Sequence, residues 1–455
     1  MTRKAVLIAV QLPGVSDVDH ASDLSELERL VRTLGFEVVA TVSQRRDALA
    51  AATVLGEGKL KELAELTGGK GTVPSGAPEV KTKVRARWAA ASKGLDKDAA
   101  ERAGADDEVR AGEADKASVV IVDHEITPSQ SRNLERATGA EVLDRTSVIV
   151  EIFHRHARSR EARLQVEIAR LNYLAPRLRE SSGGKERQRG KGAGETAVEL
   201  DRRKIRDRVA ELREQLDAIH KEQENRRHAR QDQLRVALVG YTNAGKSSLM
   251  RALTGSDVLV EDKLFATLDT TVRALQPETK PRILVSDTVG FIKKLPHDLV
   301  ASFRSTLDEA LEATLLLHVV DAADPTQDAQ IEVTRSVLRE IGADRVPTKL
   351  VFNKADRIDD DARRVLVRKH GAEGGIVLSA HDPKEVADLS RAIVAFFEAT
   401  MVDEQLLVPY DKQALLGEIY ANARVVGESY DERGTLLNVR ALPGAIGRLR
   451  RSLDG

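Results

Sequence analysis

The sequence contains no cysteine and few aromatic residues. Of its 455 residues, one is Trp, and aromatic side chains make up 3% of the total. Without cysteine the chain can form neither disulfide bonds nor cysteine-ligated metal sites, which fits the reducing cytoplasm, where we expect the protein to act. So few aromatics argue against stacking platforms for single-stranded nucleic acid. No apolar run reaches the about 18 residues of a membrane-spanning helix, so we expect none.

The sequence also lacks an excess of charge of one sign. Its 71 basic and 72 acidic residues leave a net charge of −1. This balance argues against general coating of RNA, so only local basic clusters are relevant to RNA binding. The chain is too long for one hydrophobic core, and we expect about two to four domains.

The most informative stretch is a glycine-rich segment at residues 240–247. It follows an apolar run at 236–239 that predicts a strand, and it precedes a predicted helix. Strand, glycine-rich turn and helix are the context of a P-loop, which holds a polyphosphate with backbone N–H groups. Lys246 would reach the β- and γ-phosphates, and Ser247 would ligate Mg²⁺. The predicted nucleotide-binding residues here are Gly240, Asn243, Ala244, Gly245, Lys246, Ser247 and Ser248.

A second motif, Asp287 to Gly290, follows another strand-like run. The Asp287 carboxylate is expected to hold Mg²⁺, through water, and the N–H of Gly290 to meet the γ-phosphate. The motif is weak alone, but its position downstream of a P-loop and a strand makes it informative.

A third motif predicts recognition of guanine. Asn353-Lys354-Ala355-Asp356 ends an apolar run. Asp356 can accept two hydrogen bonds from guanine that adenine cannot donate, and Lys354 would lie along the base plane. Ser379 and Ala380 follow a further apolar run and suit the last nucleotide loop. The order of these loops favours GTP over ATP.

A switch threonine is expected between Lys246 and Asp287, where it would bind Mg²⁺ when the γ-phosphate is present. We favour Thr267, with Thr270 and Thr271 as alternatives. Lys246, Thr267 and Gly290 are then the predicted catalytic residues.

Phe291 occupies the position where many GTPases place a Gln that orients the attacking water. An apolar ring cannot hydrogen-bond water. One hypothesis is that hydrolysis is slow until a partner completes the site. The alternative is that Phe291 packs beneath the switch.

These residues resemble the HflX family of translation-associated GTPases. The resembling segments are 265–269, 287–292, 295–300, 303–307, 130–135, 144–146 and 164–167. Thr270 stands where the family usually has Pro, and Ala193 replaces a Pro in the family's R-G-P-G-E-T element. The resemblance implies Mg²⁺-dependent hydrolysis of GTP to GDP and phosphate. It also implies binding to the large ribosomal subunit, near rRNA, and GTP-controlled splitting or rescue of stalled ribosomes.

Alternating strands and helices predict an α/β protein in four parts. These are a small N-terminal α/β domain at 1–157, an antiparallel two-helix coiled coil at 158–233, a P-loop GTPase domain with a doubly wound, mostly parallel sheet at 234–400, and a small α+β tail domain at 401–455. In the first domain, Ser22 is the expected cap of a helix. The insertion at 67–116 is charged and expected to be partly disordered; its basic residues around Trp88 would touch RNA or form a solvated loop.

Apolar residues spaced by three and four predict the seam of the coiled coil. They are Leu164, Ile168, Leu171, Ala175 and Leu178 in the first helix, and Ile205, Val209, Leu212, Leu216 and Ile219 in the second. Pro176 is expected to bend or stop the first helix. The tip loop, 181–195, alternates glycines with cations, and the predicted RNA contacts are Lys185, Arg187, Arg189 and Lys191. The alternative is a linker with incidental charge.

Two other functions compete with a ribosome-associated GTPase. One is a GTP-sensing adaptor that captures a protein partner through the helical rod. The other is RNA remodelling with ATP by the N-terminal domain, although residues 56–59 lack P-loop spacing and the sequence holds no second P-loop. We expect a monomer, and we interpret Asp321, His297 and His318 as structural.

Overall fold

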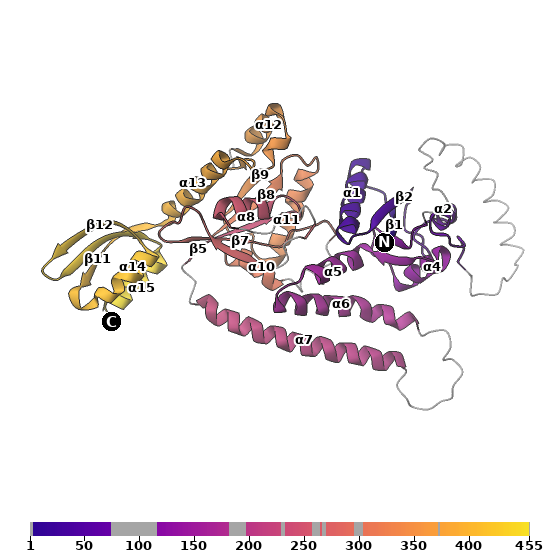
Figure 1. Cartoon of the computed structure of the whole chain (residues 1–455), viewed down its shortest axis with the longest axis horizontal. Helices are drawn as coiled ribbons and strands as arrows, with labels where there is room; N and C mark the ends of the chain where they lie inside the picture. Colours follow the sequence, from indigo (N-terminus) through magenta and orange to yellow (C-terminus); the bar gives the residue numbers. More distant parts are fainter. Residues whose placement is uncertain are drawn as a thin grey trace, which may run out of the picture. The chain divides into compact units, whose positions relative to one another are not determined.

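The protein is described by a computed structural model covering residues 3–73, 116–181, 197–228, 233–256, 264–265, 270–294, 304–371 and 374–454. The chain divides into two compact units, Met1–Val148 and Ile149–Gly455. Figure 1 follows their elements from indigo to yellow along the chain. Among the described helices, none is both long and apolar enough to span a membrane.

A parallel four-stranded sheet forms the core of the N-terminal unit (Figure 1). Its strands are β1 (Lys4–Gln11), β2 (Glu37–Arg45), β3 (Val119–Val122) and β4 (Glu141–Asp144), in the order β2-β1-β3-β4. The helices between them are α1 (Asp17–Thr33), α2 (Glu57–Thr67) and α4 (Pro128–Thr138). The central strands β1 and β3 are buried along nearly their whole length, which explains their unbroken apolar sequences. The predicted parallel α/β fold is confirmed.

The first helix begins earlier than predicted. Ser16, not Ser22, precedes α1, and its Oγ accepts a hydrogen bond from Asp19 N at 3.1 Å. Asp17 and Asp19 lie in the first turn, where negative charge complements the helix dipole. Ser22 lies inside the helix, so the predicted cap was wrong by nearly two turns.

A buried arginine joins separate segments of the N-terminal unit. Arg145 begins α5 (Arg145–His156), and its side chain is only 3% exposed. Its Nη1 donates to Asp123 Oδ1 at 2.9 Å, and its Nη2 pairs with Glu26 of α1. Asp123 directly follows β3. The cluster therefore fixes α1 to the carboxyl edge of the sheet, and each charge offsets the desolvation of the others.

Two long helices in the second unit form an antiparallel pair. They are α6 (Arg160–Ser181) and α7 (Ala197–His228). Glu161 lies near His220, and Glu167 lies near Arg208. Residue numbers therefore increase along α6 while the numbers of their partners in α7 decrease, as antiparallel helices require. The apolar seam contains Leu164, Ile168, Leu171, Ile205, Val209, Leu212, Leu216 and Ile219. Most of the predicted seam is thus confirmed, but Pro176 lies inside α6 and does not end it.

The central sheet has six strands in the order β10-β9-β8-β5-β7-β6. They are β5 (Leu234–Gly240), β6 (Thr271–Ala274), β7 (Ile283–Asp287), β8 (Leu315–Asp321), β9 (Thr348–Asn353) and β10 (Ile376–Val377). The helices of this part are α8 (Lys246–Thr254), α10 (Arg304–Leu311), α11 (Gln327–Ile341), α12 (Asp360–His370) and α13 (Pro383–Thr400). Among the described strand pairs of this sheet, β6 with β7 is antiparallel and the other four are parallel, which agrees with the predicted mostly parallel, doubly wound sheet.

The last part of the chain is a three-stranded antiparallel sheet with helices, as an α+β tail predicts. Its elements are β11 (Val402–Pro409), the 3₁₀ turns Tyr410–Leu415, α14 (Leu416–Asn422), β12 (Arg424–Asp431), β13 (Gly434–Ala441) and α15 (Pro443–Asp454). Strand β13 lies between β11 and β12. Leu406, Val408, Leu437 and Val439 are buried in its core, together with Ile446 of α15.

Replacement of Arg145 tests the buried cluster. Arg145→Met should destabilise the N-terminal unit by about 3–5 kcal/mol, because Glu26 and Asp123 would remain buried without their cation. Hydrogen exchange of peptides from α1 and β3 under rising urea measures the change. Arg32→Met is the control, since its pair with Glu28 on α1 is largely exposed and should contribute little to stability. Equal, small losses in both variants would contradict a stabilising role for the cluster.

Candidate functional site

The predicted nucleotide motifs meet at one edge of the six-stranded sheet. Strands β5, β7, β8 and β9 run parallel, so their carboxyl ends face the same side (Figure 1). Gly240 ends β5, Asp287 ends β7, Asp321 ends β8 and Asn353 ends β9, while Ser379 lies just beyond β10. Open α/β sheets bind ligands at this edge. Topology therefore gathers residues that are far apart in the sequence.

The glycine-rich segment at residues 240–247, which we call the phosphate loop, passes very close to β8 and β9 at two glycines. Gly240 has a φ of 146°, and a Cβ there would collide with the carbonyl oxygen of Val319 in β8. Gly245 has a φ of 91°, and a Cβ there would collide with Asn353 Nδ2. Only glycine combines the left-handed backbone with the missing side chain. The loop leads directly into the N-terminus of α8. Backbone N–H groups and the helix dipole attract an anion at such an end.

Lys246 is a buried cation at the start of α8. Its side chain is 6% exposed, and its Nζ donates to the carbonyl oxygens of Gly240 and Tyr241 at 3.2 and 2.9 Å. Burial lowers the pKa of this ammonium group to about 8, while the nearby Asp287 carboxylate raises it. A desolvated cation next to a helix N-terminus suits a polyphosphate.

Ser247 and Asp287 bring two oxygen ligands together. Ser247 Oγ donates to Asp287 Oδ2 at 2.7 Å, and Asp287 is fully buried. Thr288 Oγ1 anchors the following backbone by donating to Leu238 O at 2.7 Å. Hard oxygen ligands of this kind fit Mg²⁺, which usually takes one or two protein ligands and completes its shell with phosphate and water.

The backbone after Asp287 is attached to the phosphate loop. Thr242 N donates to Phe291 O at 2.7 Å, and Phe291 N donates to Gly240 O at 3.1 Å. The Phe291 ring is 1% exposed, as its packing alternative predicts. Gly290 lies against the phosphate loop, since a Cβ there would come within 2.9 Å of Lys246 Nζ. Gly290, the predicted γ-phosphate contact, thus lies next to Lys246, the predicted phosphate-binding lysine.

The segment from Asn353 to Asp356, which we call the base motif, is fixed by hydrogen bonds to two other loops. Asn353 Nδ2 donates to Ala244 O, and Asn353 Oδ1 accepts from Ala380 N, each at 3.0 Å. Ser379 Oγ donates to Asp356 Oδ1 at 2.6 Å, and this bond is the main cause that lowers the pKa of the Asp356 carboxyl. Asp356 is therefore an ionised, exposed acceptor, which recognition of guanine N1–H and its amino group requires.

Glu385 is a supporting residue that the sequence analysis missed. Its Oε2 accepts from Ser379 N at 2.6 Å, and its Oε1 pairs with Arg363. Arg363 Nη2 also donates to Val377 O at 3.3 Å. The last nucleotide loop is thus attached to both α13 and α12. A Glu in the first turn of the helix that follows Ser379 was the available sequence signal.

Asp321 was interpreted as structural, yet the structure joins it to the base motif. Its Oδ2 lies 2.7 Å from Lys354 Nζ, which also donates to Asn243 O at 2.6 Å. His318, in the same strand, is buried with its pKa lowered to about 3 by desolvation, so it is a neutral core residue. These properties of His318 agree with its interpretation as a structural residue. Asp321, by contrast, is linked to the predicted nucleotide loops.

Several predicted residues lie outside the described part of the chain. These are the switch residue Thr267, His297, most of the insertion (74–115) and the RNA contacts Lys185, Arg187, Arg189 and Lys191. Ser248 lies in the first turn of α8, and Thr271 pairs with Asp287 across β6 and β7. Near the first switch, the Phe265 ring packs edge-on against Phe153 of α5, with 4.6 Å between centroids.

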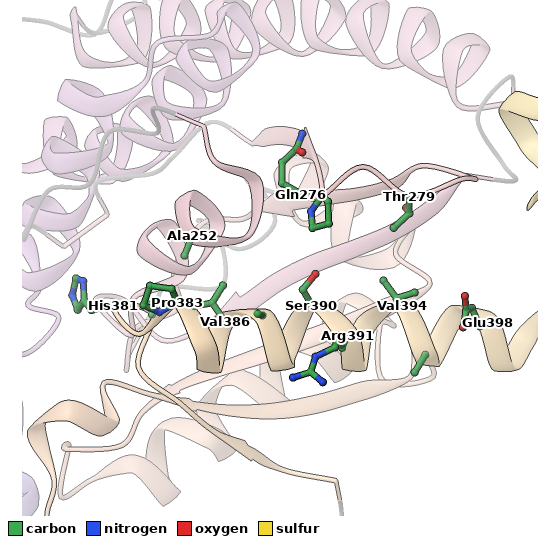
Figure 2. A pocket seen from close by; sticks show the side chains of 14 residues that line it. Ala252, Gln276, Thr279, His381, Pro383, Val386, Ser390, Arg391, Val394 and Glu398 are labelled. Atoms are coloured by element: carbon green, nitrogen blue, oxygen red, sulfur yellow. The ribbon is translucent and has the colours of Figure 1, made fainter.

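A separate groove of about 760 Å³ runs along α13, between this helix, α8 and the loop from β6 to β7 (Figure 2). Pro383, Val386, Ser390 and Val394 line its α13 side in succession. Among the predicted nucleotide residues, only Ala380 belongs to its lining. The groove is therefore distinct from the phosphate site.

Three family models match consecutive parts of the chain. The GTP-binding GTPase N-terminal model matches residues 21–73 and 79–154, and the GTP-binding GTPase middle region matches 156–230. The model of the 50S ribosome-binding GTPase matches residues 235–354. Together they extend over most of the chain, from α1 to the base motif.

Similar proteins align over nearly the whole sequence. GTPase HflX of Gluconacetobacter diazotrophicus is 65% identical over 99% of this chain and 97% of its own length. GTPase HflX of Escherichia coli is 36% identical over 96% of this chain and 93% of its own. A solved GTP-binding protein of Sulfolobus solfataricus in complex with GDP is 22% identical over 86% of this chain, at a TM-score of 0.44, a likeness too distant to assign residues. This chain belongs to the HflX family of GTPases.

Proposed function

We propose that this GTPase is a translation factor that binds the large ribosomal subunit and, in its GTP state, splits or rescues stalled ribosomes. One observation carries the proposal. The segment that matches the 50S ribosome-binding GTPases, residues 235–354, holds the phosphate loop and Asp287 and reaches the base motif. Most of the predicted nucleotide site therefore falls within the segment that carries the ribosome-associated description, and Asp356, Ser379 and Ala380 lie beyond its end.

The phosphates of GTP would be held by the loop from Gly240 to Ser248. Its N–H groups face the polyphosphate, and Lys246 places its charge between the β- and γ-phosphates. Ser247, Asp287 and Thr267 would hold Mg²⁺, which when bound neutralises charge on the phosphate oxygens. The hydrogen bond between Ser247 Oγ and Asp287 Oδ2 supports this assignment because it brings the two oxygen atoms together.

Guanine would be recognised by the base motif. Asp356 accepts from N1–H and the 2-amino group, Lys354 lies along the base, and the Ser379–Ala380 backbone meets the guanine carbonyl. The hydrogen bonds of Asn353 to Ala244 and Ala380 support this role, because they fix the three loops relative to one another.

Hydrolysis would proceed by in-line attack of water on the γ-phosphate. Gly290 N–H and Lys246 stabilise charge on that group, and both switches are released when the phosphate leaves. Because the Phe291 ring cannot orient water and is buried, we infer that a partner completes the site. The ribosome is the partner that the family suggests. We further infer that the protein acts as a cytoplasmic monomer.

Replacing the base-reading carboxylate should change nucleotide selection. Asp356→Asn replaces a carboxylate oxygen with an amide N–H donor. This donor would face the 2-amino group of guanine, which is also a donor, but it could donate to the 2-carbonyl of xanthine. We expect affinity for GDP to fall at least about 100-fold and affinity for XDP to rise. Fluorescence titration measures both constants. Asp359→Asn, which alters only the cap of α12, is the control. Unchanged GDP affinity in the Asp356 variant would refute the assignment.

Ribosome splitting can be measured directly. Purified monosomes incubated with the protein and a non-hydrolysable GTP analogue should separate into subunits on a sucrose gradient, whereas GDP should have little effect. Lys246→Ala should abolish splitting, because the γ-phosphate would lose its buried cation. A monosome fraction that stays constant with GTP or its analogue would exclude splitting. The assignment of the protein as a GTPase would not be affected by that result.

The predicted RNA contacts can be tested through salt. Binding of the tip loop to rRNA should weaken steeply as salt increases, and replacing Arg187, Arg189 and Lys191 by Ala should reduce the slope of log K against log salt by about 2–3. Cosedimentation with the large subunit provides the constants. A complex that is insensitive to salt would instead favour an adaptor that binds a protein partner.

A further inference from the structure

An ion pair links the end of β8 to the base motif. Asp321 Oδ2 lies 2.7 Å from Lys354 Nζ, and its Oδ1 accepts from Ala323 N at 3.0 Å. The side chains of Asp321 and Lys354 are only 18% and 14% exposed, so solvent screens the pair weakly. Such a pair holds its members more firmly than a surface pair does.

Lys354 also reaches the phosphate loop. Its Nζ donates to Asn243 O at 2.6 Å, and the neighbouring Asn353 Nδ2 donates to Ala244 O at 3.0 Å. Two consecutive carbonyl groups of the phosphate loop are thus held by two consecutive residues of the base motif. Lys354 itself has a φ of 63°, in the left-handed region, which a lysine adopts rarely and only when its surroundings fix it.

The Lys354 ammonium group is restrained by Asp321 as well as by the Asn243 carbonyl. A lysine ammonium group is a point charge on a flexible four-carbon chain, and a single carbonyl oxygen restrains it weakly. The Asp321 carboxylate supplies the opposite charge from the end of the buried core strand β8. A charge-assisted hydrogen bond of this length is stronger than one between neutral groups.

We propose that Asp321 is a positioning residue for nucleotide binding. It holds Lys354 against the Asn243 carbonyl, so that the phosphate loop and the base motif form one preorganised surface before GTP arrives. The proposal rests on the assignment of these loops to GTP, made above. Because preorganisation reduces the cost of binding, loss of the charge should affect how long the nucleotide stays bound rather than which base is chosen.

Asp321→Asn is the informative substitution. Asparagine keeps an oxygen that can accept from Ala323 N and removes only the charge that faces Lys354. We expect GDP and GTP to dissociate about 10-fold faster, with a matching rise in Kd, while preference for guanine over adenine is retained. At saturating GTP, kcat should change by less than about twofold. Stopped-flow dissociation of fluorescent nucleotides gives the rates.

A double-mutant cycle separates positioning from a local structural role. In a Lys354→Gln background, Asp321→Asn should change nucleotide dissociation by less than about twofold, because the interaction is already lost. If the 10-fold effect persists in that background, Asp321 acts through its own turn, and the proposal is wrong. Asp324→Asn is the control. It alters the carboxylate that accepts from Thr326 N, at the start of α11, and should leave nucleotide dissociation unchanged.

The outcome also distinguishes this inference from the proposed function. If the unaltered protein binds no guanine nucleotide, the nucleotide assignment itself fails. If it binds GDP and Asp321→Asn binds equally well, only the role of Asp321 is refuted. Thermal unfolding without nucleotide shows whether the variant is folded, and the cycle remains decisive if its stability is reduced.

Discussion

The nucleotide site depends on one steric constraint, the contact of the phosphate loop with the ends of β8 and β9. At Gly240 and Gly245 the loop approaches Val319 and Asn353 so closely that no side chain fits. This contact allows Asn353 and Lys354 to donate to carbonyl groups of the loop. The loops proposed to bind phosphate and base are therefore built on one packed interface rather than being independent, and their geometry is shared.

Much of this site could be predicted because its chemistry uses short sequence motifs at strand ends. A glycine-rich turn between a strand and a helix has few structural interpretations, so the positions of Lys246 and Ser247 follow from it. The seam around Leu164 and Leu212 was predictable for a similar reason, since helical spacing determines which side chains share a face. Local patterns sufficed wherever local geometry determined the contact.

Contacts between distant segments could not be predicted in this way. Asp321 and Glu385 are ordinary acidic residues in the sequence, and their partners are known only once the loops are placed together. Arg145 is similar, because its partners Glu26 and Asp123 come from different elements. The Ser22 prediction failed for a different reason. Ser22 has the residue type of a cap, but the helix begins earlier, after Ser16, whose side chain accepts from Asp19 N.

The attachment of Phe291 to the phosphate loop has a consequence for sequence variation. Both hydrogen bonds use main-chain atoms, with Phe291 N and O bonded to Gly240 and Thr242. Nineteen of the twenty amino acids carry the required N–H, and only proline lacks it. These two hydrogen bonds therefore do not depend on the identity of the side chain, although the packing of the buried ring does. Exchange of a water-orienting residue for an apolar one at this position would leave both hydrogen bonds to the phosphate loop in place.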